Sequence, residues 1–180
     1  SLENYSAGKV ASLNFGVEAL NFTQVDGAAP HTPSFDAGLP PIILQACVYR
    51  NGTAMELPSF SLNLSNTLAF MTSTCSSSGR TKGRVTSREI TGTINPYMDD
   101  TSVSRFDDWV AGTTFSLLAY AYNPTSTSGE FEDAVAIWMP NCVATEFKVA
   151  DQDGVLVEEI GFRATRGTAG TTDELFMTFF

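Results

Sequence analysis

The chain has few of the residue types on which most enzyme chemistry depends. It contains one histidine, His31, and three cysteines in 180 residues. Cys47, Cys75 and Cys142 are an odd number, widely spaced and without a C-x-x-C pair. Neither a disulfide framework nor a structural zinc site is therefore predicted, and we expect buried free thiols. No serine lies in a G-x-S-x-G motif, which argues against a nucleophilic triad that uses His31.

Long apolar runs are also missing. No stretch of about 18 apolar residues occurs, so no membrane-spanning helix or membrane anchor is predicted. The first ten residues lack the apolar centre of a signal peptide. The chain begins at Ser1 and not at Met, which fits either a processed protein or the latter part of a longer one.

The acidic motifs give little support to metal binding or hydrolysis. The segment 151–154, DQDG, begins like a calcium loop, but its glycine comes too early for the twelve-residue spacing, and a hairpin turn explains it better. A glycosidase would need two facing carboxylates, whereas adjacent acids on a strand point to opposite faces. We therefore interpret these acids as solvated surface and expect no catalysis and no cofactor. The candidate acids are Asp99, Asp100, Asp107, Asp108, Glu130, Glu132, Asp133, Glu158 and Glu159.

Charge is distributed unevenly along the chain. Residues 1–98 hold six acids and six bases, whereas residues 99–180 hold 14 acids and four bases, so the net charge of −10 belongs to the second half. Four of the ten bases lie within nine residues: Arg80, Lys82, Arg84 and Arg88. A solvated surface is one interpretation. The other is that a basic segment of one copy meets an acidic face of the next copy, which would favour self-assembly.

Period-two patterns and turn signals predict a mainly β protein. Strands are expected over 10–22, 42–49, 55–64, 84–94, 113–122, 134–140, 146–150, 155–164 and 175–180. Asn51-Gly52 and Asp153-Gly154 are hairpin turn signals, and the polar segment 72–83 predicts a long loop. This pattern favours one domain over 1–180, an antiparallel β-sandwich or barrel with one short flanking helix.

The helix is predicted directly after the basic segment. Asn95-Pro96 ends the preceding strand, and Thr101 or Ser102 is placed to cap the helix. Val103, Phe106 and Val110 recur at spacings of three and four, and Gly112 supplies a left-handed stop. We expect this apolar face to cover the core.

Several segments together resemble tail tube proteins of long-tailed bacteriophages, in particular their C-terminal part. The similarity covers nearly the whole chain in order, and order and spacing carry most of its weight. It includes a strand that ends at Phe22 and is followed by a loop with Pro33, Phe35 and 39–41, LPP. The main matching segments are 57–68 (LPSFSLNLSNTL), 90–100 (ITGTINPYMDD), 106–117 (FDDWVAGTTFSL) and 153–180 (DGVLVEEIGFRATRGTAGTTDELFMTFF).

The resemblance implies a structural subunit with neither catalysis nor a cofactor. In that family, subunits close into hexameric rings whose inner sheets join, and stacked rings form a tube that conducts DNA at ejection. It implies a location in the phage tail after assembly in the host bacterial cytoplasm, with tape measure, terminator and tail-tip proteins as partners. We expect contacts between copies at the segment 72–88 and at Arg80, Lys82, Arg84, Arg88, Asp99 and Asp100. Members of the family usually carry more chain in front, and many have a Gly-Arg before the segment that in this sequence is TSRE, residues 86–89.

A second hypothesis, of a different class, is a carbohydrate-binding β-sandwich of a secreted or tail-fibre protein. Trp109, Trp138, Tyr120 and Tyr122 are the aromatic residues that could form a sugar-stacking platform. Binding to a glycan array that disappears when either tryptophan is changed to alanine would favour it.

Overall fold

The computed structural model describes residues 1–6, 12–19, 46–76, 79–121, 134–167 and 173–179. These residues belong to two compact units. The first unit comprises residues 1–14, 41–65 and 89–180, and the second comprises 15–40 and 66–88. The predicted organisation as a single domain over 1–180 stays a prediction.

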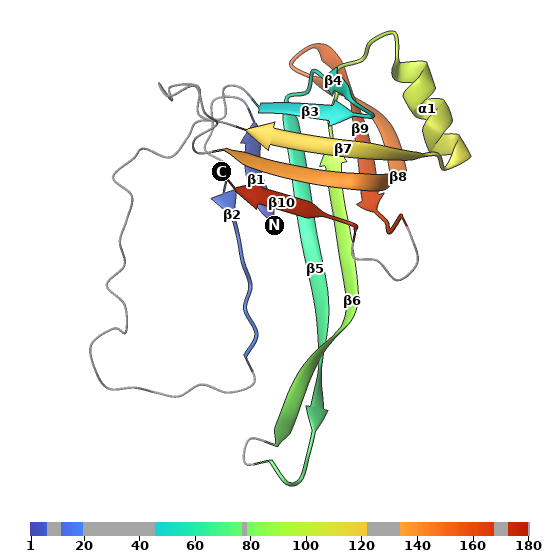
Figure 1. Ribbon diagram of the computed structural model, residues 1–180. Helices are drawn as coiled ribbons and strands as arrows, with labels where there is room; N and C mark the ends of the chain where they lie inside the picture. The colour runs from blue at the N-terminus through green and yellow to red at the C-terminus, as the bar shows by residue number, and fades with distance from the viewer. Residues whose placement is uncertain (7–11, 20–45, 77–78, 122–133, 168–172, 180) are drawn as a thin grey trace, which may run out of the picture. The chain divides into compact units, whose positions relative to one another are not determined.

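The described residues form antiparallel strands and one helix, as predicted for the fold class (Figure 1). The neighbours in the sheet are β2-β1-β5-β6-β9-β8-β7-β3-β4, and β10 pairs with β8. The bounds are β1 Leu2–Ser6, β2 Ser12–Leu13, β3 Ala46–Arg50, β4 Thr53–Met55, β5 Ser59–Thr72, β6 Arg80–Ile94, α1 Ser102–Ala111, β7 Thr114–Ala121, β8 Val135–Gln152, β9 Val155–Ala164 and β10 Phe176–Phe179.

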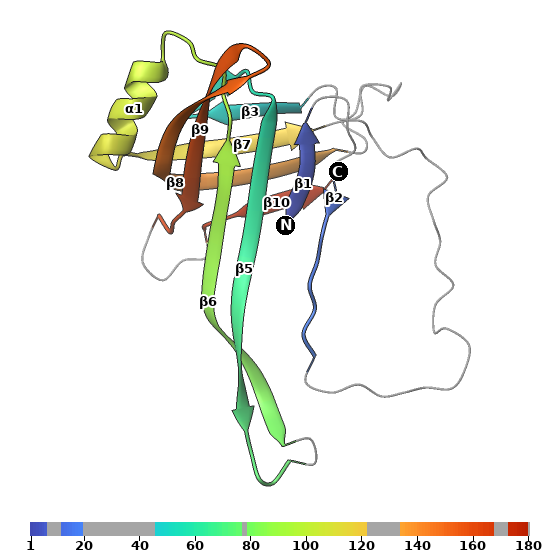
Figure 2. The same ribbon diagram turned by 180° about the vertical axis from the view of Figure 1, so that it is seen from behind.

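Two groups of strands make the layers of the first unit. In both ribbon views β3, β7 and β10 run across the direction of β1 and the inner parts of β5 and β6 (Figures 1 and 2). Strand β8 joins the two groups, because its first part pairs with β7 and its second part pairs with β9. A long strand that changes partners along its length lets two sheets pack across each other without a break in the chain.

Strand β8 corrects the prediction of separate strands at 134–140 and 146–150. It runs unbroken through Pro140 because the sheet contains a bulge there: β7 pairs Leu117 with Met139 and Phe115 with Cys142, so two residues of β8 face one residue of β7. A bulge tolerates proline, which has no amide hydrogen for the ladder. A second register shift lies between Ala144 and Glu146, where β8 pairs with β9.

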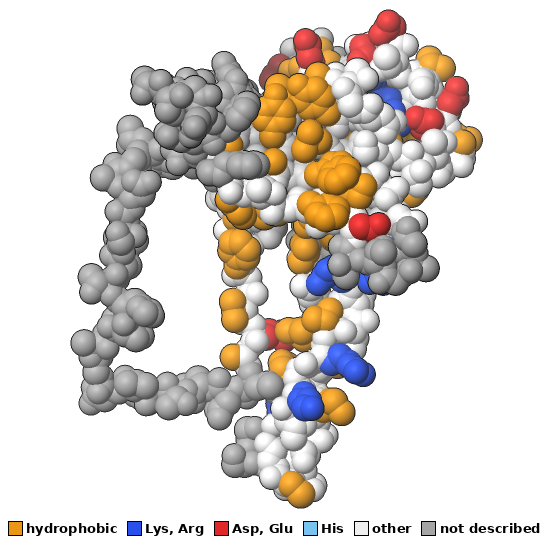
Figure 3. All heavy atoms as spheres, in the orientation of Figure 1, with side chains coloured by type: hydrophobic (Ala, Val, Ile, Leu, Met, Phe, Trp, Pro, Cys, Tyr) orange, Lys and Arg blue, Asp and Glu red, His pale blue; other side chains and the backbone are white. Residues whose placement is uncertain are grey.

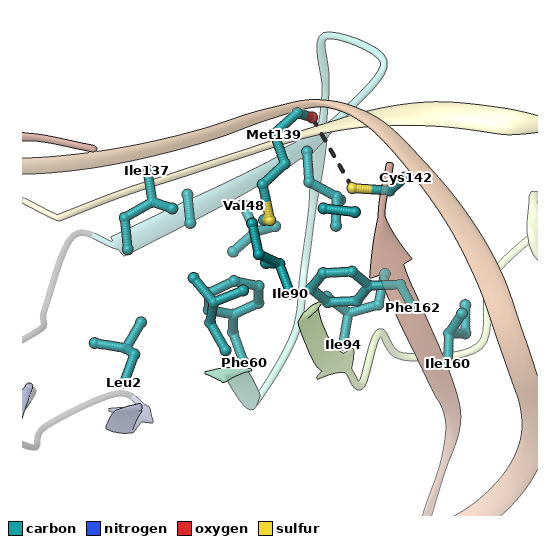
Figure 4. Close-up of a cluster of buried hydrophobic side chains, with 14 of the residues drawn as sticks. Leu2, Val48, Phe60, Ile90, Ile94, Ile137, Met139, Cys142, Ile160 and Phe162 are labelled. Carbon is teal, nitrogen blue, oxygen red and sulfur yellow. Dashed lines mark hydrogen bonds between the residues drawn. The ribbon is translucent and has the colours of Figure 1, made fainter. Parts of the chain in front are cut away.

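The core of the first unit lies between these two layers (Figure 4). Strand β7 alternates as predicted, with Phe115, Leu117 and Ala119 buried. The opposite layer contributes the stacked rings of Phe60 and Phe162, whose centroids are 6.1 Å apart. The other buried apolar residues include Val48, Ile90, Ile94, Ile137, Met139, Cys142 and Ile160.

The glycine turns appear where the sequence predicts them. Asn51 and Gly52 have φ angles of 51° and 81°, and Asp153 and Gly154 have φ angles of 55° and 84°. Positive φ at both central residues is the signature of the tight hairpin turn that matches strand twist. The two turn residues of each hairpin therefore fix how its flanking strands pair: β3 with β4, and β8 with β9.

Strand β6 begins earlier than predicted, so the segment 72–83 is not a long loop. Strand β5 continues to Thr72 and β6 starts at Arg80, which makes 66–88 mainly a two-stranded hairpin. Within the second unit, the Thr86 hydroxyl donates to the carbonyl of Thr67 at 3.1 Å, and the Ser73 amide donates to the carbonyl of Gly79 at 3.1 Å. The turn is therefore shorter than predicted, between Thr72 and Arg80, and the strand residues on either side of it are largely exposed.

The predicted strand over 10–22 is mostly wrong within the residues that the structure describes. Only Ser12–Leu13 forms a strand, and residues 14–19 are not strand; the remainder of the prediction lies outside the described residues. Phe15 and Val17 are 80% and 88% exposed. Asn14 still exchanges backbone hydrogen bonds with Ser1, at 2.9 and 2.8 Å. An alternating pattern needs a neighbouring strand to satisfy its backbone groups, and residues 15–19 pair with no described strand.

The three cysteines are free, and they differ in exposure. Cys142 is buried and Cys75 is exposed, so the expectation of buried thiols holds for Cys142 and is wrong for Cys75. Burial raises the pKa of the Cys142 thiol to about 12. The thiolate is the reactive form, so Cys142 has almost none of it at neutral pH.

We therefore expect different rates of thiol labelling at pH 8. Cys75 should react with a maleimide in the native protein, whereas Cys142 should react only after denaturation. Mass spectrometry of labelled peptides measures both rates, with the Cys75→Ser variant as the control. Labelling of native Cys142 as fast as Cys75 would contradict the buried position.

Candidate assembly surfaces

Helix α1 is held on the first unit mainly by a buried ion pair. The Arg105 Nε donates to Glu158 Oε2 of β9 at 2.6 Å, and both side chains are almost completely buried. Glu158 is 0% exposed, which corrects the interpretation of this acid as solvated surface. Burial alone would lower the pKa of Arg105, but hydrogen bonds to Glu158 and Asp99 raise it, so the guanidinium stays charged.

The turn before α1 is built around Asp99. Its Oδ1 accepts hydrogen bonds from the Thr101 amide at 2.8 Å and the Thr101 hydroxyl at 2.7 Å, and it lies 2.9 Å from Arg105 Nη2. Thr101 itself makes no side-chain cap, and the Ser102 hydroxyl accepts from the Asp99 amide at 3.0 Å. The predicted capping by Thr101 or Ser102 is therefore wrong, whereas the predicted stop at Gly112, with φ of 65°, is confirmed.

The hydrogen bonds to Asp99 should make stability depend on pH. Partial burial would raise the pKa of Asp99, but the hydrogen bonds from Thr101 and Arg105 outweigh it and lower the pKa below 3.8. A lowered pKa contributes stability that is present above pH 3.8 and is lost as the pH falls through the folded-state value. Asp99→Asn should therefore destabilise the protein at pH 7 and have a smaller effect at pH 3. Urea unfolding at both pH values measures this, and a pH-independent difference would contradict it.

Asp100→Asn is the matched control for that measurement. Asp100 is exposed and makes no ion pair with any residue in the described ranges. Its substitution should change the unfolding midpoint little at either pH, because isolated surface charges contribute little to stability.

Two further contacts fix α1 in place. Arg50 of β3 bonds Asp108 at 2.5 Å, and the Arg50 guanidinium lies 4.6 Å from the ring centre of Phe115. On the other side, Phe106 and Trp109 pack on Phe147 of β8, with ring centroids 5.4 and 6.1 Å away. Charged and aromatic contacts therefore dock the helix in place of the expected aliphatic face.

The apolar face of α1 points outward. Val103 is 71% exposed and Val110 is 66% exposed, and Phe106 is exposed in part despite its contact with Phe147. The prediction that this face covers the core is therefore wrong for Val103 and Val110 and holds in part for Phe106, which packs on Phe147 beside the core. Periodicity shows that a helix has an apolar face, but not that its own chain covers that face. Asp107 is also exposed, between the two valines along the helix.

The second unit carries the basic residues on one strand. Arg80, Lys82, Arg84 and Arg88 all belong to β6, and Lys82 and Arg84, two positions apart, share one side of the strand. The Arg80 guanidinium lies 4.8 Å from the ring centre of Phe70, and Arg88 donates to the side chain of Asn66 at 3.3 Å. Lys and Arg side chains gather over this hairpin in Figure 3. The predicted contact residues are thus brought together along one strand, and we name their surface the basic face.

Asp99 and Asp100 belong to the first unit and differ in their surroundings. The Asp99 carboxylate forms an ion pair with Arg105 and accepts a hydrogen bond from Thr101 of its own chain, whereas Asp100 is exposed. Sequence reasoning missed Arg105, which organises this region. One feature of the sequence indicates its importance: Arg105 is the one base among four acids in residues 97–112, so it is expected to form ion pairs there.

Strand β10 carries a second exposed apolar surface. A strand forms here, as predicted for 175–180, and it pairs with β8, yet Phe176, Met177 and Phe179 remain exposed. Trp138 of β8 stacks on Phe176 with centroids 5.3 Å apart. One side of the Trp138 ring is therefore occupied, and Trp109 is packed on Phe147. Trp138 remains 45% exposed on its other parts, whereas Trp109 is only partly exposed, so of the two tryptophans only Trp138 keeps much of the accessible surface that sugar stacking requires.

Two other kinds of site, metal centres and membrane spans, have patterns that can be compared with the described residues. No group of three or more His, Cys, Asp or Glu side chains among them could hold a metal ion. In that part of the chain no helix is both long and apolar enough to cross a membrane. The predicted candidates Glu130, Glu132 and Asp133, together with His31 and Tyr122, lie outside the described residues.

The family comparison decides the class of protein. The family described as phage tail tube protein matches residues 4–173. The chain belongs to this family. The resemblance of the sequence to tail tube proteins is thereby confirmed, and the matched range includes α1 and the basic face of this tail tube protein. No curated protein matches the chain.

Solved structures agree with the tail tube fold. The sheath/tube terminator of an extracellular contractile injection system, PVC, is 15% identical, with a TM-score of 0.58 over 79% of this chain and 99% of that chain. The tube terminating cap of the anti-feeding prophage is 12% identical, with a TM-score of 0.58 over 82% and 96%. A chain of the PVC sheath-tube complex is 14% identical, with a TM-score of 0.55 over 80% and 95%. At these identities the likeness concerns the fold alone.

Proposed function

We propose that this tail tube protein is a non-enzymatic subunit that assembles with its own copies into hexameric rings. Stacked rings would form the channel through which DNA leaves the virion. Assembly would take place in the host bacterial cytoplasm, with tape measure, terminator and tail-tip proteins as partners. Arg80, Lys82, Arg84, Arg88, Asp99 and Asp100 are proposed to act at or beside contacts between copies.

The observation that carries this proposal is the hairpin of residues 66–88. Its strand residues are largely exposed, and an isolated two-stranded hairpin has only marginal stability in water. Four bases and no acid occur in this segment. Neighbouring bases on one strand face start about 7 Å apart and repel by roughly 0.6 kcal/mol per pair in water. An acidic partner surface would relieve both costs.

A terminator or cap in the same tail is a related candidate, since two of the structures named above are described as a terminator and a cap. Such a protein would form a single ring that does not stack on itself. A tube subunit would form larger assemblies as its concentration rises.

Sedimentation velocity over a range of concentrations tests the proposal. A tube subunit should give a six-copy species and then larger species at higher concentration. A species that stops at one ring would favour the terminator or cap. A single monomer boundary at all concentrations would contradict self-assembly.

A further inference from the structure

The outward side of α1 combines apolar and acidic residues. Val103, Asp107 and Val110 follow one another at spacings of four and three, so they form a line along the helix. Asp100 lies just ahead of the helix at the same end as Val103. We name these four residues the α1 line. Asp99 and Asp108 do not join it, because they are paired with Arg105 and Arg50.

The basic face of the hairpin is complementary to the α1 line in charge and in length. Ten helical residues span about 15 Å, and the positions of Arg80, Lys82 and Arg84 span about 13 Å along an extended strand. A line of acidic and apolar residues thus matches a basic strand face of similar length.

We propose that the α1 line is the docking surface for the β5–β6 hairpin of a second copy of this chain. Lys82 and Arg84 of one copy would pair with Asp100 and Asp107 of the next, around contacts of Val103 and Val110. The inference rests on the proposed function and names the contact that would hold neighbouring copies together in the assembly. Because the two surfaces differ, each copy offers one hairpin and one helix, and the contact repeats from copy to copy.

Charge reversal on each surface tests this docking. The hairpin variant carries Lys82→Glu and Arg84→Glu, and the helix variant carries Asp100→Lys and Asp107→Lys. Each should raise the concentration needed for assembly about tenfold or more, because close charge pairs across interfaces couple strongly. A chain with all four changes should return to within about threefold of the original protein.

The matched control reverses two charges on another exposed surface. Glu159→Lys and Arg163→Glu lie on one side of β9 at alternate positions and are exposed. These changes should leave the assembly concentration within about twofold of that of the original protein. Circular dichroism of every variant confirms that the fold is retained, and surface charge changes are not expected to unfold it.

The outcomes separate this inference from the proposed function. One outcome is that the original protein assembles while the chain with all four changes needs as high a concentration to assemble as the hairpin variant. In that case the α1 line is not the surface that binds the hairpin. The same conclusion follows if reversal of Asp100 and Asp107 leaves assembly unchanged, which would leave α1 to a different partner protein. If the original protein never assembles, the proposed function fails and the inference with it.

Discussion

Replacement of Arg105 by methionine is expected to lower the free energy of unfolding by about 3–5 kcal/mol. Methionine fills similar space but cannot bond Glu158, which is 0% exposed. Arg105 Nε bonds Glu158 Oε2, and Oε1 has no hydrogen-bond partner in the described structure, so the variant would leave this carboxylate without its ion pair. Removal of one member of a buried pair leaves an uncompensated charge in a low-dielectric site. Urea unfolding at pH 7, followed by tryptophan fluorescence, measures the loss.

The double variant Arg105→Met with Glu158→Leu is the control for this prediction. It removes both charges and leaves an apolar contact, so it should recover much of the stability lost by Arg105→Met alone. A double variant as unstable as the single one would show that Arg105 acts through Asp99 or Thr101 and not through Glu158. A change below about 1 kcal/mol in the single variant would contradict the buried ion pair.

Replacement of Gly92 by alanine is expected to destabilise the protein by about 3 kcal/mol or more. A Cβ at this position would lie 2.2 Å from the carbonyl oxygen of Ser61 and 2.6 Å from the ring of Phe162. The first of these neighbours is backbone of the adjacent strand and the second is a fully buried core ring. Close packing leaves neither room to move.

Gly83→Ala is the matched control because Gly83 lies in the same strand. A Cβ there would meet only the ring of Phe70, at 3.2 Å, and that side chain lies on the exposed hairpin. We expect a change below about 1 kcal/mol, as for most surface substitutions. Thermal unfolding of both variants is the measurement. Equal effects at Gly83 and Gly92 would contradict the close approach of β5 and β6 at Gly92.

The features predicted correctly from sequence have a local chemical cause. Asn51-Gly52 and Asp153-Gly154 are confirmed as tight turns because positive φ angles favour those residues. Strand β6 ends at Ile94, just before Asn95-Pro96, and α1 stops at Gly112. In each case a few adjacent residues determine the backbone.

The errors concern features that depend on residues far apart in sequence. Arg105 and Glu158 are 53 positions apart, and the residues around each of them do not indicate that the two side chains pair. The sequence predicts that a strand ends at Pro140, but a bulge against β7 accommodates this proline and the strand continues. The exposed side of Val103 could not be predicted, since an apolar helix face has the same period whether its own chain or another copy covers it.

The hairpin could have been predicted from its charges. Residues 66–88 lack the apolar alternation of a half-buried strand, so the segment resembles a loop in composition. The even spacing of Arg80, Lys82, Arg84 and Arg88 is itself a period of two, which is typical of a strand.

Negative-stain electron microscopy of the purified full chain tests the central claim, that this tail tube protein assembles with itself, most directly. At increasing protein concentration and low salt, we predict rings with a central opening, followed by stacks of rings. High salt should reduce both, because it screens the contact between the basic face and its acidic partner. Uniform small particles without rings at every concentration and salt condition would contradict the account.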